Sequence, residues 1–170
     1  MLTGLPAGIG EELTGNPAVR KISFTGSTAV GRLLMRQSAE QIKRLSLELG
    51  GNAPFIVFDD ADLEQAIVGV MQSKFRNAGQ TCVCANRILV QDGIYERFAA
   101  RLVEEVGKLK VGDGQQAGTS IGPLINAAAV SKVARHIDDA LSQGAQLLCG
   151  GLPSGCLLYT SDAADEGLGV

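Results

Sequence analysis

The sequence predicts an α/β fold with a mainly parallel sheet. Segments that are typical of strands, some alternating and some continuously apolar, are separated by longer segments in which apolar residues have helical spacing. The repeated order of strand, helix and strand indicates crossover connections, which join parallel strands. With 170 residues, of which 45% are hydrophobic and 19% are charged, the chain is long and apolar enough to bury a core.

The first part of the chain predicts one strand–helix–strand unit. Ser27 or Thr28 can cap the helix, because a hydroxyl accepts a hydrogen bond from a free N–H group of the first turn. The alternating segment LSLEL predicts a half-buried strand, which Gly50 ends. The predicted elements are, in order, a short helix at Gly10–Thr14, a strand at Arg20–Phe24, a turn at Thr25–Thr28, a helix at Ala29–Ile42 and a strand at Leu45–Leu49.

The remainder of the chain repeats this alternation. Ala53–Phe58 is continuously apolar, so we expect a strand that is buried on both faces. Asp60 or Asp62 can cap the helix that follows and that runs to about Arg76. The later predicted elements are a strand at Arg87–Gln91, helices at Tyr95–Lys108 and Ala127–Gln143, and a strand at Ala145–Cys149.

The composition changes at Cys156, where the segment CLLYTSDAADE begins. Back-translation of Cys156–Ser161 is compatible with TGTCTCTTATACACATCT, a transposon end used in sequencing adapters, and Asp162–Glu166 continues that adapter. We therefore expect residues 155–170 to be an artefactual tail without a function.

The composition excludes several classes of function. The net charge is −3 and Lys43–Arg44 is the largest basic cluster, so nucleic acid is not expected as a partner. No apolar run approaches the roughly 20 residues of a membrane span, and the start lacks the pattern of a secretory signal. The four cysteines lack the spacing of a zinc site or a disulfide framework, so we expect no metal and a reducing, cytoplasmic compartment.

Cys82 and Glu48 are the residues that suggest chemistry. Cys82 lies in the short polar segment FRNAGQTCVCAN, between a predicted helix and a predicted strand that can present it rigidly. Glu48 lies among apolar residues in LSLELGGN. A thiol and a carboxylate of this kind favour covalent catalysis with a general base. The alternative is a buried structural cysteine and an ordinary strand-end glutamate.

The glycine-rich segment FTGSTAVG joins a predicted strand to a predicted helix. Backbone N–H groups at a helix N-terminus among small residues can bind a phosphate group. The glycine spacing is GxxxxG rather than GxGxxG, which leaves an ordinary strand-to-helix turn as the alternative.

FTGSTAVG, LELGGNAPFIV and FRNAGQTC, in this order and spacing, resemble the aldehyde dehydrogenase superfamily over roughly Leu2–Gly151. SLELGGNAPFIVFDDADL and SKFRNAGQTCVCANR are most similar to bacterial succinate-semialdehyde dehydrogenases and to relatives that act on glutarate semialdehyde. The resemblance implies the end of a Rossmann-type NAD(P)-binding domain at 1–49 and the first half of a parallel-sheet catalytic domain at 50–154. It also implies a much longer complete subunit, which forms a homo-oligomer (a dimer or tetramer).

The same resemblance assigns roles to single residues. Cys82 matches the nucleophile that attacks the aldehyde, and its backbone N–H matches one donor to the oxyanion. Glu48 matches the general base that activates the hydrolytic water. The cofactor would be NAD or NADP, with its pyrophosphate at Ser27. The positions that match the cofactor site are Ser27, Gly26, Gly31, Leu49 and Gly50.

Arg76 and Cys84 match features of the succinate-semialdehyde enzymes. Arg76, six residues before Cys82, resembles an arginine that holds the distal carboxylate of the substrate, for which a guanidinium is well shaped. The alternative is a solvated arginine at a helix end. Cys84 resembles a second thiol that forms a reversible disulfide with the nucleophile in some members; the alternative is a bystander thiol. The residues that we interpret as structural are Lys74, His136 and Cys149.

Other functions stay open. A non-catalytic nucleotide-binding or scaffold domain would not need both Cys82 and Glu48, and another thiol acyl-enzyme, such as a hydrolase, would need a better-placed partner than His136. Within the family, a broader-specificity or betaine-aldehyde enzyme is the alternative. The family's asparagine oxyanion donor and its adenosine-ribose residues would lie upstream of Met1, and its nicotinamide-ribose motif beyond Gly151. We therefore expect the chain as written to be inactive.

Overall fold

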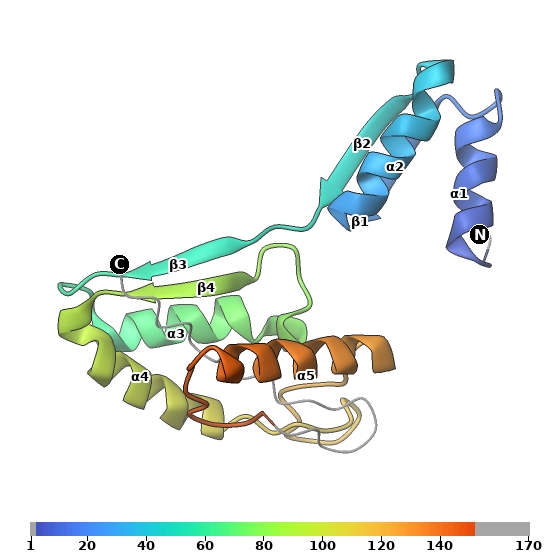
Figure 1. Cartoon of the computed structure of the whole chain (residues 1–170). Coiled ribbons are helices and arrows are strands. Elements are labelled where there is room, and N and C mark those ends of the chain that lie inside the picture. Colours follow the sequence, from blue (N-terminus) through green and yellow to red (C-terminus); the bar gives the residue numbers. More distant parts are fainter. Residues whose placement is uncertain (1–2, 152–170) are drawn as a thin grey trace. The chain divides into compact units, whose positions relative to one another are not determined.

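The computed structural model describes residues 3–151, which divide into two compact units between Gly51 and Asn52 (Figure 1). Each unit contains one pair of parallel strands with a helix in the crossover, so the predicted α/β class is confirmed. The division lies two residues after the boundary expected at Leu49. The expected tail at 155–170 is outside the described residues. None of the helices within 3–151 combines the length and the hydropathy needed to cross a membrane.

The first unit is a strand–helix–strand crossover with a further helix before it. Its elements are α1 Pro6–Gly15, β1 Lys21–Gly26, α2 Thr28–Ser38, the 3₁₀ turn η1 Ala39–Gln41 and β2 Arg44–Leu49. The side chain of Ser27 caps α2 by accepting a hydrogen bond from the N–H of Val30 at 3.3 Å, as one of the two predicted caps. Ile22 of β1 and Leu34 of α2 are buried and form the interior of this unit.

Lys43 fastens the loop between α1 and β1 to the start of β2. Its side chain is only 9% exposed, and its Nζ donates to the carbonyl oxygens of Asn16 at 2.6 Å and Val19 at 2.7 Å. The third donor goes to Oε1 of Gln41 at 2.9 Å. An ammonium group has three donors, and a buried one must use them to offset its loss of hydration. The cation therefore has a structural role here.

The second unit begins with a second strand–helix–strand crossover. Its elements are β3 Ala53–Val57, α3 Leu63–Lys74, the 3₁₀ turn η2 Arg76–Gly79, β4 Ala85–Val90, α4 Asp92–Gly107 and α5 Ala127–Ser142. Of the two predicted caps of α3, Asp62 is the one used, and its Oδ1 accepts from the N–H of Gln65 at 3.0 Å. Asn126 caps α5 in the same way, by accepting from the N–H of Ala129 at 2.9 Å.

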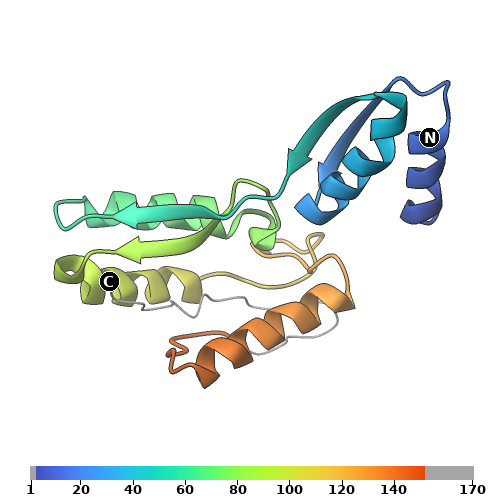
Figure 2. The same cartoon turned by 45° about the horizontal axis from the view of Figure 1, so that its top comes forward.

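One hydrophobic core holds the strands and the first two helices of this unit together. Its fully buried members are Val57, Ile67, Val70, Ile94, Phe98 and Leu102. Helices α3 and α4 lie on one face of the strands, and Figure 2 views the other face. On that other face Ile56 is 53% exposed and its partner Leu89 is 47% exposed. The expectation that Ala53–Phe58 is buried on both faces is therefore wrong for this chain, because helices cover only one face of the pair.

A predicted strand, a predicted helix end and a predicted turn also differ from the structure. Ala145–Cys149 is not a strand, because no described strand supplies the hydrogen-bond partners that an extended segment needs. Helix α2 ends at Ser38, and the chain takes a left-handed conformation at Ile42, with φ of 51°, before β2. Thr25 and Gly26 do not turn the chain, since the parallel ladder with β2 continues through both.

A cluster of ion pairs joins α3 to α4. Arg101 of α4 contacts Glu64 of α3 at 3.0 Å and also contacts Glu105, one turn further along its own helix. Lys108 contacts Glu105 at 2.7 Å and Glu104 at 3.1 Å. Hydrogen bonds from Lys108 and then from Arg101 lower the pKa of the Glu105 carboxyl. Because the cluster is partly exposed, solvent screens it, and its contribution to stability is modest.

Candidate active site

The loop that carries Cys82 begins in an unusual backbone conformation. Asn77 and Ala78 both have φ of 54°, and Gly79 follows with φ of 72°. Left-handed conformations are disfavoured for residues with a Cβ atom, so such a run persists only where surrounding contacts hold it. A Cβ atom at Gly79 would lie 3.2 Å from the carbonyl oxygen of Lys74. The glycine of the GQTC motif thus allows the loop to turn back against the end of α3.

The two thiols of this loop have different surroundings. Cys82 is exposed, whereas Cys84 is only 2% exposed and donates to the carbonyl oxygen of Lys74 at 3.2 Å. The next residue, Ala85, donates its N–H to Oγ of Ser73 at 3.3 Å. Both contacts fasten the end of the loop to the last turn of α3. The reading as a buried structural cysteine therefore fits Cys84, and the accessible thiol is Cys82.

Arg76 is the first residue of η2 and is exposed. The structure records no ion pair for Arg76 with any residue between 3 and 151. Its guanidinium is therefore available to an anion, in the same unit as Cys82 and on the same loop.

Glu48 lies near the end of β2 in the first unit. Along β2 the half-buried residues are Leu45, Leu47 and Leu49, and the exposed residues between them include Glu48. The apolar setting expected for this carboxylate is not formed among residues 3–151, because alternate side chains of a strand point to opposite faces. Glu48 faces away from the leucines that flank it in sequence.

The residues expected to bind the cofactor gather at the carboxyl ends of β1 and β2. Gly26 pairs with Leu49 at the end of the parallel ladder, Ser27 caps α2 directly after it, and Gly50 follows β2. Ligands of open parallel sheets bind at the carboxyl ends of the strands, and a helix N-terminus presents free N–H groups to an anion. This edge therefore presents free N–H groups and a hydroxyl, which are groups that can bind an anion.

Gly31 has a packing role at this edge. It is buried in α2, and a Cβ atom there would lie 2.6 Å from Cδ2 of Leu49. Glycine lets α2 lie directly on the end of β2, so Gly31 affects this edge only through the position of the helix.

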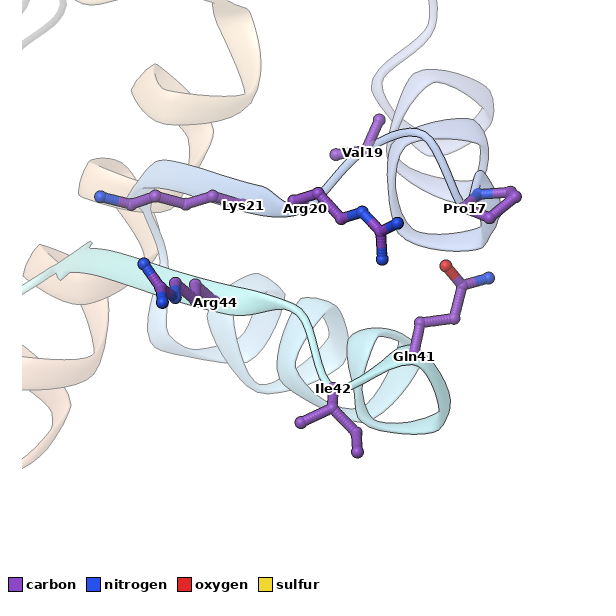
Figure 3. Close-up of a pocket in the computed structure, with 7 residues that line it drawn as sticks. All are labelled: Pro17, Val19, Arg20, Lys21, Gln41, Ile42 and Arg44. Carbon is purple, nitrogen blue, oxygen red and sulfur yellow. The ribbon is translucent and has the colours of Figure 1, made fainter.

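A hollow of about 760 Å³ lies at the opposite, amino ends of the same strands (Figure 3). Figure 3 shows three cationic side chains around it, Arg20, Lys21 and Arg44. The other lining residues are Pro17, Val19, Gln41 and Ile42. None of the expected catalytic or cofactor residues lines this hollow.

Two features are typical of nucleotide-dependent α/β enzymes that use a thiol. One is a glycine-rich helix start at the carboxyl edge of a parallel sheet, and the other is an exposed thiol on an anchored loop. A family model described as the aldehyde dehydrogenase family matches residues 1–159. The chain belongs to the aldehyde dehydrogenase family.

Several relatives are known by activity. The chain is 63% identical over 151 residues to the succinate-semialdehyde dehydrogenase [NADP(+)] of Escherichia coli and covers 31% of it, with 89% of this chain aligned. It is also 61% identical to a glutarate-semialdehyde dehydrogenase of Pseudomonas putida. That alignment includes 89% of this chain and 32% of the length of the relative. The chain thus spans about a third of the length of these curated relatives.

Solved structures agree with this assignment. The succinate-semialdehyde dehydrogenase of Burkholderia pseudomallei matches with a TM-score of 0.92 and 58% identity, over 94% of this chain and 33% of that one. A betaine aldehyde dehydrogenase of Staphylococcus aureus, solved in complex with NAD+, matches with a TM-score of 0.85 and 35% identity, over 90% of this chain and 30% of that one.

Proposed function

We propose that the complete protein of which this chain is a segment oxidises an aldehyde to a carboxylic acid with NAD or NADP. The observation that carries the proposal is the contrast within one loop, where Cys82 is exposed and Cys84 is buried against α3. An accessible thiol between two anchored elements suits a nucleophile. In this proposal the segment before the division between Gly51 and Asn52 belongs to the cofactor domain, and the segment after it begins the catalytic domain.

The chemistry of the chain's own residues follows from this assignment. The proton of the Cys82 thiol passes to the carboxylate of Glu48, which returns it to solvent before the hydrolytic step. The sulfur forms a bond to the carbonyl carbon as the C=O π bond opens, which gives a thiohemiacetal oxyanion, and the backbone N–H of Cys82 donates to that oxyanion. When bound, NAD(P)+ supplies the acceptor for the hydride that this carbon loses. The resulting thioester is cleaved by water, from which the carboxylate of Glu48 takes a proton, and the acid and the Cys82 thiol are released.

The carboxyl edge of the first unit fits the cofactor. The hydroxyl of Ser27 and the first N–H groups of α2 lie where a pyrophosphate can accept hydrogen bonds. Gly26 lies at the end of β1, with the ring of Phe24 2.5 Å from where its Cβ atom would be. Gly31 keeps α2 close to Leu49, so that the helix start stays at this edge.

Arg76 supports a substrate with a second, anionic end. The relatives named for succinate semialdehyde, glutarate semialdehyde and 3-sulfolactaldehyde act on aldehydes that carry a carboxylate or a sulfonate. A guanidinium binds both kinds of anion through paired hydrogen bonds. We therefore propose succinate semialdehyde as the substrate, with glutarate semialdehyde, betaine aldehyde or a broader range of aldehydes as alternatives.

The complete enzyme is further proposed to be a cytoplasmic homo-oligomer, a dimer or a tetramer. The sequence supports the reducing compartment, since its cysteines lack the spacing of a disulfide framework.

Two substitutions in the complete enzyme test the proposed function. Cys82→Ala removes the nucleophile and is expected to abolish aldehyde oxidation, while Glu48→Gln is expected to slow release of the acid more than formation of NAD(P)H in the first turnover. Stopped-flow absorbance of NAD(P)H separates these two phases. Full turnover by Cys82→Ala would refute the proposal. The purified 170-residue chain is expected to show no activity, and its turnover of succinate semialdehyde would refute that separate expectation.

A further inference from the structure

The side chain of Gln80, two residues before Cys82, bridges two segments that are far apart in sequence. Its Oε1 accepts a hydrogen bond from the backbone N–H of Ile125 at 2.9 Å. Its Nε2 donates to the carbonyl oxygen of Asn77 at 3.1 Å and, at a longer 3.5 Å, to that of Pro123. One amide group thus joins the left-handed turn at the start of the loop to the segment that leads into α5.

An apolar contact supports the same junction. Ala78 packs against the small cluster formed by the buried residues Leu124 and Ile137, to which other residues of α5 also contribute. The methyl group of Ala78 and the amide group of Gln80 therefore both fasten the turn to the segment before α5, which belongs to the same unit. A left-handed backbone at Asn77 and Ala78 needs this kind of external support.

The two ends of the loop have separate anchors. After Cys82, the thiol of Cys84 and the N–H of Ala85 are bound to the end of α3. Before Cys82, the anchor is Gln80, which reaches in the other direction, to Ile125. Cys82 lies between them with its side chain exposed, so its position depends on both anchors.

We propose that Gln80 is a positioning residue that sets the reactive geometry of Cys82 by fastening the loop to the Pro123–Ile125 segment. The proposal rests on the role of Cys82 given above. The hydrogen bonds of the Gln80 side chain within residues 3–151 all go to backbone groups, so in this proposal it acts through the backbone of the loop. A nucleophile displaced by about 1 Å can lose roughly a hundredfold in rate while substrate binding is kept, because alignment matters most at the reacting atoms.

The experiment uses Gln80→Met in the complete enzyme, because methionine has the length of glutamine and none of its hydrogen bonds. Gln80→Glu is the rescue variant, since its carboxylate can still accept from Ile125. Gln72→Met is the matched control, because Gln72 is exposed on α3 and has no hydrogen bond in the described part of the chain that involves its side chain. The measurements are kcat and KM, the rate of alkylation of Cys82 by iodoacetamide, and amide exchange at Ile125.

In Gln80→Met we expect kcat to fall by about ten- to a hundredfold with KM nearly unchanged. The rate of amide exchange at Ile125 should rise about fivefold, the factor that corresponds to one ordinary hydrogen bond. The rate of alkylation of Cys82 should also differ from the wild-type rate. Gln80→Glu should restore Ile125 protection and part of kcat, and the control should match the wild type.

Unchanged kcat and unchanged Ile125 exchange in Gln80→Met would overturn the inference, as would an equal loss in the Gln72→Met control. If Gln80→Met does not fold, Gln80→Glu decides. Protection of the Ile125 amide with kcat above one-hundredth of the wild-type value supports the role of Gln80 as a positioning residue. Loss of that protection, or a lower kcat, overturns it. A different result, an active Cys82→Ala enzyme, would refute the proposed function. In that event the amide exchange at Ile125 would still test whether Gln80 fastens the loop to the Pro123–Ile125 segment.

Discussion

Cys84 donates its thiol hydrogen to the carbonyl oxygen of Lys74 at 3.2 Å, at the last residue of α3. This bond buries one cysteine of the loop and leaves Cys82, two residues earlier, exposed. The structure thereby gives two neighbouring thiols opposite surroundings. A direct Cys82–Cys84 disulfide would require Cys84 to leave its place on α3, which argues for the bystander interpretation of the second thiol.

The first prediction concerns the order of thiol modification. In the folded chain, iodoacetamide is expected to alkylate Cys82 first, half-buried Cys149 later, and Cys84 roughly a hundredfold more slowly than Cys82, because Cys84 must wait for local opening. Peptide mass spectrometry over a time course measures the three rates. In denaturant the rates should converge. Equal labelling of Cys82 and Cys84 in the folded chain would contradict the burial of Cys84.

The second prediction concerns Gly31. Gly31→Ala places a methyl group 2.6 Å from Cδ2 of Leu49, so we expect the first unit to lose about 1 kcal/mol of stability once the helical preference for alanine is offset. Gly8→Ala in α1, where nothing lies within 4 Å, is the control and should be neutral or stabilising. Urea unfolding measures both. A combined Gly31→Ala and Leu49→Ala variant should show less than the sum of the two single costs.

The third prediction concerns the substrate. In the complete enzyme, Arg76→Ala is expected to raise the KM for succinate semialdehyde at least about tenfold more than the KM for an uncharged aldehyde, since it removes a charge-assisted contact to the distal carboxylate. Arg97→Ala, an exposed arginine on α4, is the matched control and should change neither value. Equal effects of Arg76→Ala on both aldehydes would rule out the carboxylate contact.

The fourth prediction concerns the pH dependence of stability. The lowered pKa of Glu105 means that its ion pairs stabilise the fold above the pKa of an unfolded glutamate, about 4.3, and that this contribution is lost as the pH falls through the folded pKa. Glu105→Gln should therefore lose less stability than the wild type between neutral and acid pH. Urea midpoints at several pH values test this. Glu96→Gln, on the same helix, should follow the wild-type curve.

Local patterns predicted the elements whose signals lie within a few residues. Each of two helix caps was expected at one of two residues, Ser27 or Thr28 and Asp60 or Asp62. Ser27 and Asp62 form the caps, because a cap needs only the N–H groups of the following turn. The periodicity that predicted α3 and α5 likewise depends on each helix alone. Interpretations that depend on a partner strand were less successful, as Ala145–Cys149 shows, which forms no strand within residues 3–151.

The order of residues is sufficient to predict the parallel α/β class and the family, both of which are confirmed. Three motifs in fixed order name Ser27, Glu48 and Cys82 as candidates without reference to any contact. Those motifs are short and local, so they can be found in the chain as written.

Tertiary packing settles what surrounds each candidate. It buries Cys84 rather than Cys82, leaves Glu48 exposed on β2, and joins Gln80 to Ile125 across 45 residues of sequence. Burial and hydrogen-bond partners depend on which distant segments meet, and no local pattern contains that information. For this reason the sequence names Cys82 as the candidate thiol, and only the fold shows the contacts that anchor its loop.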